Sequence, residues 1–220
     1  MSLFHRDSGL VLTLGKALTY DAECVQISLD CRSENNVLIC GHDLQMKRYF
    51  LIELILSSDG CNDCEELIYI GDNVPELLSK YTSKKFISMS CITEFINKFQ
   101  DDFFNKRRII IIDNIDMNRE IGFPPSFGQP APLLKSFMDF WADANKHGSH
   151  IIAFYDGMSR IKASKLPTDS FIYRIGYALN SDEKNQLLGN TAYSNSAPER
   201  QRAFLANNLV IDAWFRPYEF

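Results

Sequence analysis

Four consecutive isoleucines at residues 109–112 restrict the fold of this chain more than any other feature. A strand that is apolar at every position needs both faces covered, as central strands of parallel sheets are. Similar apolar runs recur along the chain, separated by helix-length segments, and this rhythm is typical of β–α–β units. The runs are residues 37–40, 67–70, 109–112, 150–154 and 171–175. The sequence therefore predicts an α/β fold with a mainly parallel sheet flanked by helices.

Other segments predict a hairpin and two helices. Residues 1–32 contain two alternating apolar runs, which indicates a leading β-hairpin. Residues 48–56 are apolar almost all round and predict a buried helix. Residues 132–147 place apolar side chains at three- and four-residue spacing, and Gly148 suits the end of that helix.

The domain organisation follows from the same pattern. Residues 122–130 contain three prolines and two glycines and predict a loop, whereas residues 209–215 predict a last strand. A length of 220 residues suits one large domain or two small ones. We see no repeat or low-complexity tract and expect a single domain over residues 1–220.

Composition excludes several function classes. Acidic residues number 28 and basic residues 23, and this balance argues against nucleic acid as the main partner. No apolar run approaches the roughly 18 residues of a membrane-spanning helix. The first residues also lack the charged and apolar regions of a secretory signal. We expect a soluble, cytosolic piece.

Six cysteines raise the questions of disulfides and metals. Cys61 and Cys64 are the one spaced pair, but no second pair or suitably spaced histidines follow them. A structural metal and a redox role remain open for this pair. The pattern favours free thiols in a loop, and we predict no metal site.

A weakened phosphate-binding loop follows the first parallel strand. The P-loop motif is glycine, four residues, glycine, lysine and then serine or threonine. Gly41 and Lys47 occupy their places, but Met46 replaces the second glycine and Arg48 replaces the hydroxyl residue. Asp43 adds a negative charge to a loop that would receive a polyanion. The candidate nucleotide-binding residues are therefore remnants.

The isoleucine strand ends in a second remnant. Asp113 follows the four isoleucines and resembles the Walker B aspartate that reaches the magnesium shell. Active ATPases commonly have a glutamate next, but Asn114 stands there, and a carboxamide cannot accept a proton. General-base assistance, worth roughly 10²–10⁴-fold, should be absent. Alternatively, Asp113 only ends the strand or pairs with Lys47 in an empty site, and this alternative is favoured.

The order and spacing of these features resemble the RecA-like motor domains of the FtsK/SpoIIIE family. The hairpin, the loop at Gly41, the run ending at Asp113 and the strand at residues 150–153 fall in that order. In the family the latter strand ends in a threonine–glutamine sensor, and Tyr155 and Asp156 stand at the matching positions. The resemblance implies a RecA-like P-loop fold.

Two further segments extend the resemblance over most of the chain. Residues 166–168 resemble the family's isoleucine–proline–threonine entry to its next strand, and residues 186–189 resemble its leucine–leucine–glycine loop. The ending at residues 215–220 and the acidic charge are most similar to the type VII secretion motors, the EssC and EccC group. Within that group the chain resembles a degenerate, C-terminal third ATPase domain.

That resemblance implies a fragment of a larger membrane-anchored protein, lying on its cytoplasmic side. The implied function is a non-hydrolysing ATPase-like module that docks substrates or regulates neighbouring motor domains. Its implied partners are ATPase domains of the same chain and secreted helical-hairpin substrates, with no nucleic acid. An active ATP-hydrolysing motor domain for protein or DNA translocation is the alternative. We expect no cofactor, and only weak binding of Mg-ATP.

Partner binding has one candidate surface in the sequence. Phe123 and Phe127 lie in the proline-rich loop, and aromatic side chains there can anchor a partner helix. Alternatively, both rings fold back over the edge of the sheet. The interpretation that both rings fold back over the sheet is slightly favoured.

Overall fold

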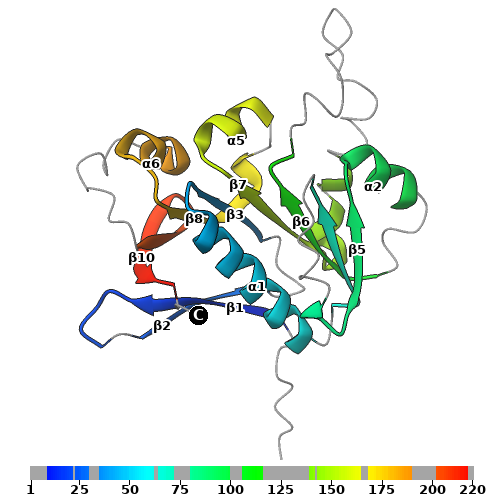
Figure 1. Ribbon diagram of the computed structural model, residues 1–220, viewed down its shortest axis with the longest axis horizontal. Coiled ribbons are helices and arrows are strands. Elements are labelled where there is room, and N and C mark those ends of the chain that lie inside the picture. The colour runs from blue at the N-terminus through cyan, green and yellow to red at the C-terminus, as the bar shows by residue number, and fades with distance from the viewer. Residues whose placement is uncertain are drawn as a thin grey trace, which may run out of the picture.

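The fold is a single ten-stranded sheet with helices on both faces, seen in a computed structural model of the chain (Figure 1). The structure describes residues 9–21, 23–29, 35–61, 64–71, 80–99, 106–115, 139–141, 143–164, 168–189 and 202–217. The strands are β1 (Leu10–Ala17), β2 (Cys24–Leu29), β3 (Asn36–Gly41), β4 (Glu66–Ile70), β5 (Lys85–Met89), β6 (Arg108–Asp113), β7 (His150–Tyr155), β8 (Phe171–Tyr177), β9 (Ala203–Asn207) and β10 (Val210–Arg216). Their order is β2-β1-β10-β9-β8-β3-β7-β6-β4-β5.

The sheet has a parallel and an antiparallel part. Strands β8, β3, β7, β6, β4 and β5 pair in parallel, and β3, the strand before the phosphate-loop remnant, lies between β8 and β7. Strands β9, β10, β1 and β2 continue the sheet in antiparallel pairs beyond β8. The predicted mainly parallel sheet and the leading hairpin are confirmed.

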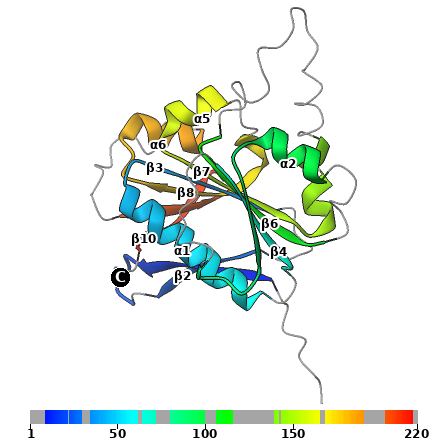
Figure 2. The ribbon, with the colours of Figure 1, turned by 45° about the vertical axis from the view of Figure 1, so that its right-hand side comes forward.

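The described helices cover opposite faces of the sheet (Figure 2). They are α1 (Leu44–Gly60), α2 (Ile92–Phe99), α5 (Met158–Ser164) and α6 (Ser181–Leu188), with short 3-10 turns at Asn145–His147 and Thr168–Ser170. One core lies under α1, and the other lies under α2, α5 and α6.

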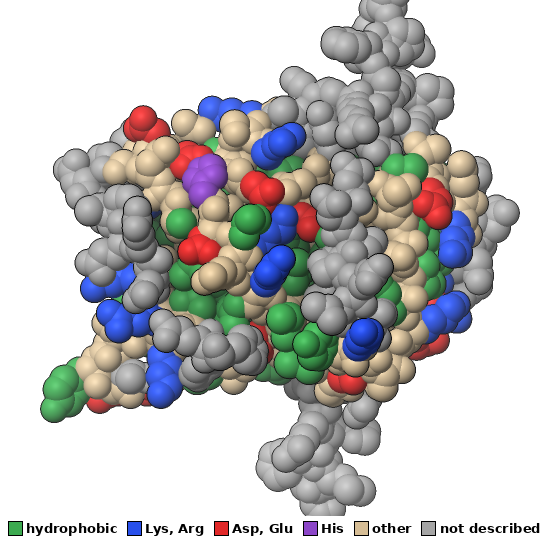
Figure 3. All heavy atoms as spheres, viewed as in Figure 1, with side chains coloured by type: hydrophobic (Ala, Val, Ile, Leu, Met, Phe, Trp, Pro, Cys, Tyr) green, Lys and Arg blue, Asp and Glu red, His purple; other side chains and the backbone are tan. Residues whose placement is uncertain are grey.

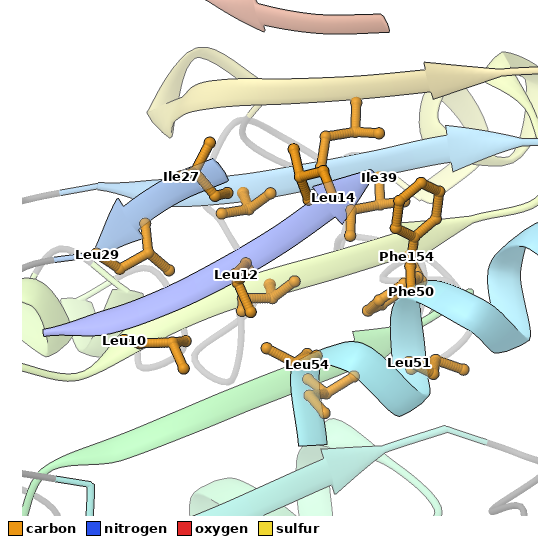
Figure 4. Packing of buried hydrophobic residues seen from close by; sticks show 14 of the residues in the cluster. Leu10, Leu12, Leu14, Ile27, Leu29, Ile39, Phe50, Leu51, Leu54 and Phe154 are labelled. Carbon is orange, nitrogen blue, oxygen red and sulfur yellow. The ribbon is translucent and has the colours of Figure 1, made fainter. Parts of the chain in front are cut away.

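The leading hairpin closes the first of these cores. Leu10, Leu12 and Leu14 of β1 belong to the same buried cluster as Leu51 and Leu54 of α1, and Figure 4 shows Leu10 and Leu12 on the side of β1 that faces Leu54. All five side chains are at most 3% exposed. The alternation predicted for this segment arises because one face of β1 packs on α1.

Several boundaries differ from the sequence prediction. Helix α1 is longer than residues 48–56 and begins at Leu44. The leucines of residues 186–189 belong to α6, which ends at Leu188 and is capped by Gly189 in the left-handed conformation, so this segment is the end of a helix. Within residues 132–147, the described residues 139–141 and 143–144 are helical, and Gly148 ends the following turn with φ 74°. The predicted loop 122–130 lies outside the described residues.

Candidate functional site

The candidate site lies at the carboxyl ends of four adjacent parallel strands. Strands β3, β7, β6 and β4 are neighbours, so the residues that follow them meet at one edge of the sheet. This edge brings Lys47 near Asp113, Asn114 and Asp156. Ligands bind at such an edge in many α/β proteins, which makes it the place to examine the phosphate-loop remnant.

Lys47 is at the centre of an ion-pair network. Its Nζ lies 2.5 Å from Asp113 Oδ1 and 2.9 Å from Asp156 Oδ1. Only 8% of Lys47 is exposed, and 12% of the Asp113 side chain. A buried ammonium is costly unless opposite charges compensate it, and here two carboxylates do so. The lysine that would contact a nucleotide's phosphates is therefore held by the protein itself.

Two further side chains fix these carboxylates. The Tyr69 hydroxyl, from β4, donates to Asp113 Oδ2 over 2.5 Å. Burial and the charge of Asp113 raise the pKa of Tyr69, so the hydroxyl remains a donor. The Asn114 side chain donates to Asp156 Oδ2 over 2.5 Å and accepts from the Asp156 backbone N–H over 2.8 Å. Asn114 itself has φ 52°, a left-handed conformation that asparagine tolerates better than most residues.

The start of α1 shows why the phosphate loop is closed. Asp43 is the N-cap, and its Oδ1 accepts from the backbone N–H groups of Gln45 over 2.8 Å and of Met46 over 3.1 Å. In a P-loop, backbone N–H groups of this stretch cradle the phosphates. A carboxylate of the chain takes their place here. The helix begins at Leu44, because a capping aspartate precedes it and Met46 is a good helix former where the motif has glycine.

Contacts on both sides hold the closed loop. His42 Nε2 lies 2.8 Å from Glu183 Oε1 of α6. A Cβ on Gly41 would lie 2.2 Å from the Tyr177 carbonyl oxygen and 2.4 Å from its ring, so only glycine fits at the end of β3. The loop is therefore packed against both β8 and α6.

The predicted site residues separate into two groups. Gly41, Lys47, Asp113 and Asn114 converge as expected for strand ends. Arg48 is exposed, and no hydrogen bond or ion pair joins it to that network among the described residues. Phe123 and Phe127 lie outside the described residues.

Sequence reasoning missed three contributors: Asp156, Tyr69 and the capping role of Asp43. Asp156 was singled out only as a departure from the sensor position. Its position directly after the predicted strand at residues 150–154 marks Asp156 as a strand-end residue, but its neighbours follow only from the sheet order, in which β7 lies between β3 and β6. Tyr69 lies on β4 next to β6, where Tyr69 pairs in register with Ile111.

The residues present do not fit Mg-ATP. One cation faces two carboxylates, the N–H groups at the helix start are used, and Asn114 is bound to Asp156. In the described part of the chain, no three His, Cys, Asp or Glu side chains are grouped to hold a metal. Cys61 and Cys64 are buried and form no disulfide, and burial raises the pKa of Cys64 to about 11. None of the described helices is long and apolar enough to cross a bilayer.

Comparisons with known proteins give a fold but no sequence family. Neither a scan of protein families nor a search of curated proteins gave a match. Among solved structures, EssC ATPases 2 and 3 from Geobacillus thermodenitrificans matches at TM-score 0.63 and 16% identity, over 96% of this chain and 45% of that one. The cytoplasmic domain of the Thermomonospora curvata type VII secretion ATPase EccC matches at 0.60 and 11%, over 94% and 28%.

Two further matches belong to the same structural group. EccC ATPases 2 and 3 in complex with a signal sequence peptide matches at TM-score 0.58 and 10% identity, over 100% of this chain and 44% of that one. The conjugation coupling protein TcpA of pCW3 with ATPγS matches at 0.55 and 13%, over 97% and 66%. The chain thus shares a RecA-like α/β fold with these solved structures, and it spans less than half the length of the EssC and EccC chains.

Proposed function

We propose that this chain is a non-hydrolysing ATPase-like module of a type VII-like protein secretion motor. The observation that carries the proposal is the Asp43 carboxylate on the N–H groups of Gln45 and Met46. A phosphate would have to displace it and also separate Lys47 from two carboxylates. Either change removes interactions of the folded state before any new one forms.

Other residues than those that close the loop support the absence of ATP hydrolysis. Asn114 has no proton-accepting group, and its amide is engaged with Asp156. Arg48 has no hydroxyl for a magnesium ion. A water molecule at this edge therefore has neither a base at position 114 nor a metal ligand at position 48.

The secretion role rests on the likeness to EssC and EccC. These relatives carry consecutive ATPases, and the chain covers less than half of each. We propose that residues 1–220 are one degenerate domain of a longer membrane-anchored protein, lying on its cytoplasmic side. Its task is to dock substrates or to regulate the adjacent ATPase domains. The EccC complex with a signal sequence peptide supports secretion substrates as partners, and we propose that these are helical hairpins.

Nucleotide titration tests the proposal. Millimolar Mg-ATP should raise the melting temperature by no more than about 2 °C, because we expect it to bind weakly. A ligand present at 100 times its dissociation constant would stabilise the fold by about 2.7 kcal/mol and give a clearly larger shift. Phosphate release should stay below about 1 s⁻¹. Turnover above that rate, lost on Lys47→Ala, would establish the alternative of an active motor domain. The triple variant Met46→Gly, Arg48→Thr, Asn114→Glu should regain some binding.

A separate experiment addresses docking. If Phe123 and Phe127 anchor a partner, changing both to alanine should weaken binding of a helical-hairpin substrate or of the adjacent motor domain. The melting temperature should not change. Reduced stability with unchanged binding would assign both rings to the core.

A further inference from the structure

A pocket lies between α5 and α6, away from the phosphate-loop remnant. It has a volume of about 310 Å³ and opens over β3 and β8. Figure 1 shows α5 and α6 side by side above those strands. Its lining consists of four apolar side chains from three elements, the cations Lys162 and Arg174, and the polar residues Thr168 and Gln186. The apolar residues are Leu38, Met158, Ile161 and Leu187. A cavity near 300 Å³ is at the lower end of the range for small-molecule sites.

The floor of this α5–α6 pocket contains a buried guanidinium. Arg174 is 6% exposed and belongs to β8, where it pairs in register with Leu38 of β3. It donates to the carbonyl oxygens of Phe171 over 3.4 Å, Thr168 over 2.9 Å and Leu187. An arginine has more N–H donors than these bonds use.

Arg174 has no carboxylate partner at ion-pair distance within the described part of the chain. Burial lowers the pKa of Arg174, and the charge of Asp169 opposes that effect. Asp169 is exposed and is the one acid whose charge acts on the guanidinium. An arginine remains protonated even so. A buried charge without a paired counter-ion is costly, which makes this position suited to an anion.

A purely structural role explains part of the arrangement. Arg174 satisfies the Leu187 carbonyl in the last turn of α6, where a cation is favourable. That role requires neither an open cavity beside the guanidinium nor a second cation. Lys162 of α5 is exposed and also lines the pocket. Both cations therefore line the same pocket as the four apolar side chains.

We propose that the α5–α6 pocket binds a small carboxylate carried on a short apolar chain. The carboxylate pairs with Arg174 and Lys162, and the apolar chain lies against Leu38, Ile161 and Leu187. This site is independent of the closed phosphate loop and of the proposed secretion role. The carboxylate belongs either to a free acid or to the end of an apolar peptide.

Matched probes separate charge from hydrophobic contact. Octanoate should bind with a dissociation constant of about a millimolar or less by calorimetry, which is ordinary for a ligand of this size. 1-Octanol should bind at least about tenfold more weakly, and octylammonium should not bind. Equal binding of octanol and octanoate would overturn the proposal. A short peptide that ends in leucine tests whether the natural ligand is a peptide C-terminus. If it is, the free-acid form of this peptide should bind more tightly than octanoate, and the C-terminal amide should not bind.

Surface variants keep the test away from the buried arginine. Lys162→Glu should weaken octanoate binding about three- to tenfold, whereas Asp169→Asn should strengthen it about two- to threefold. Lys98→Glu, an equal charge change on exposed Lys98 of α2, is the control and should have no effect. An Asp169→Asn variant with unchanged affinity, or a Lys98→Glu variant as weak as Lys162→Glu, would contradict a carboxylate site at Arg174.

Discussion

Lys47 shows how single side chains in this site depend on one another. It needs Asp113 and Asp156 because it is buried, and Tyr69 and Asn114 in turn bind those carboxylates. Removing one member leaves a buried charge or donor unsatisfied, which costs more than the lost bond itself. Substitutions within the network should therefore couple strongly.

The contact between the Asn114 amide and Asp156 can be tested by placing a charge at position 114. Asn114→Asp replaces the amide that donates to Asp156 with a second carboxylate, so the two oxygens repel. We expect urea unfolding at pH 7 to show a loss of about 1–3 kcal/mol. Asn97→Asp on the exposed face of α2 is the matched control and should change stability by less than about 0.5 kcal/mol.

Exchange of the two groups provides the rescue. Asn114→Asp combined with Asp156→Asn restores one amide facing one carboxylate and should recover part of the loss. Equal stabilities for the Asn114→Asp and Asn97→Asp variants would show that the Asn114–Asp156 contact contributes nothing.

The buried carboxylate of Glu66 should make the free energy of unfolding depend on pH in the acidic range. It is 2% exposed, and Lys85, Lys106 and Arg108 bind its two oxygens. Burial alone would raise its pKa, but these three cations outweigh burial and lower the pKa to about 2. A depressed carboxyl pKa stabilises the fold above the unfolded value near 4.3, and the contribution disappears as pH falls toward 2.

Glu66→Gln isolates that contribution. The variant should be about 2–4 kcal/mol less stable than the natural chain at pH 7, because three cations lose their shared carboxylate. The difference should shrink between pH 4.5 and 2, measured by urea unfolding at each pH. The adjacent exposed Glu65 offers the control Glu65→Gln, for which we expect a constant, small difference. A stability difference between Glu66→Gln and the unsubstituted chain that does not vary with pH would contradict a depressed pKa for Glu66.

The sequence identified part of the site because position along a strand is visible in it. Lys47 and Asp113 follow recognisable motif positions, and both converge. Asp156 could not be placed in the network from sequence, since its contact with Asn114 depends on β7 lying beside β6 in the sheet. Sheet order depends on packing between distant segments, which no local pattern encodes.

At the scale of elements, α1 is positioned by its first residue as much as by its apolar faces. The Asp43 carboxylate binds two of the N–H groups that a helix start leaves free. Asp43→Ala should cost about 0.5–2 kcal/mol in thermal unfolding, whereas Asp43→Asn keeps an acceptor and should cost less. Asn180→Ala, at the capping box of α6, should have a similar cost and is the comparison.

The same variant links the helix to nucleotide binding. If the carboxylate closes the loop, Asp43→Ala should bind Mg-ATP more tightly than Asn180→Ala does. Identical, undetectable binding in both variants would assign the loss of binding to the Lys47 ion pairs instead.

Most strands were predicted from their apolar patterns, including the leading hairpin at one edge of the sheet, but β5 at the other edge and β9 were not. Fully apolar β6 was clear from its isoleucines, but β5 exposes alternate residues at the edge of the sheet and has only five residues. Strand β10 was predicted as the last strand, but its pairing with β9 in a hairpin was missed because the turn is Asn208–Leu209. Both have positive φ, of 47° and 67°, where hairpins more often use glycine.

For the whole molecule, the leading hairpin is part of the main core and not an appendage. Leu12 is 3% exposed between β1 and α1, whereas its neighbour Val11 is 44% exposed on the other face. Leu12→Ala should cost about 2–5 kcal/mol, and Val11→Ala should cost less than about 0.5 kcal/mol. The unfolding transition should stay single for both variants. A separate early transition for Leu12→Ala would show that the hairpin unfolds alone.

The face of the molecule seen in Figure 3 does not favour a polyanion as a partner. Acidic and basic side chains alternate over the face seen in Figure 3, and no large area of it is of one sign. Non-specific nucleic-acid binding needs a continuous basic area, and the excess of acidic residues, 28 against 23, opposes one.

The pairing of β1 with β10 makes the order of synthesis matter. Lys16 lies opposite Arg216, so two strands that leave the ribosome far apart in time become neighbours. At ordinary elongation rates of about 5–20 residues per second, β1 waits on the order of 10–40 s for that partner. During this wait its unpaired edge is open to other nascent chains. Chaperone dependence should therefore fall when translation is fast, and rise when rare codons delay β10.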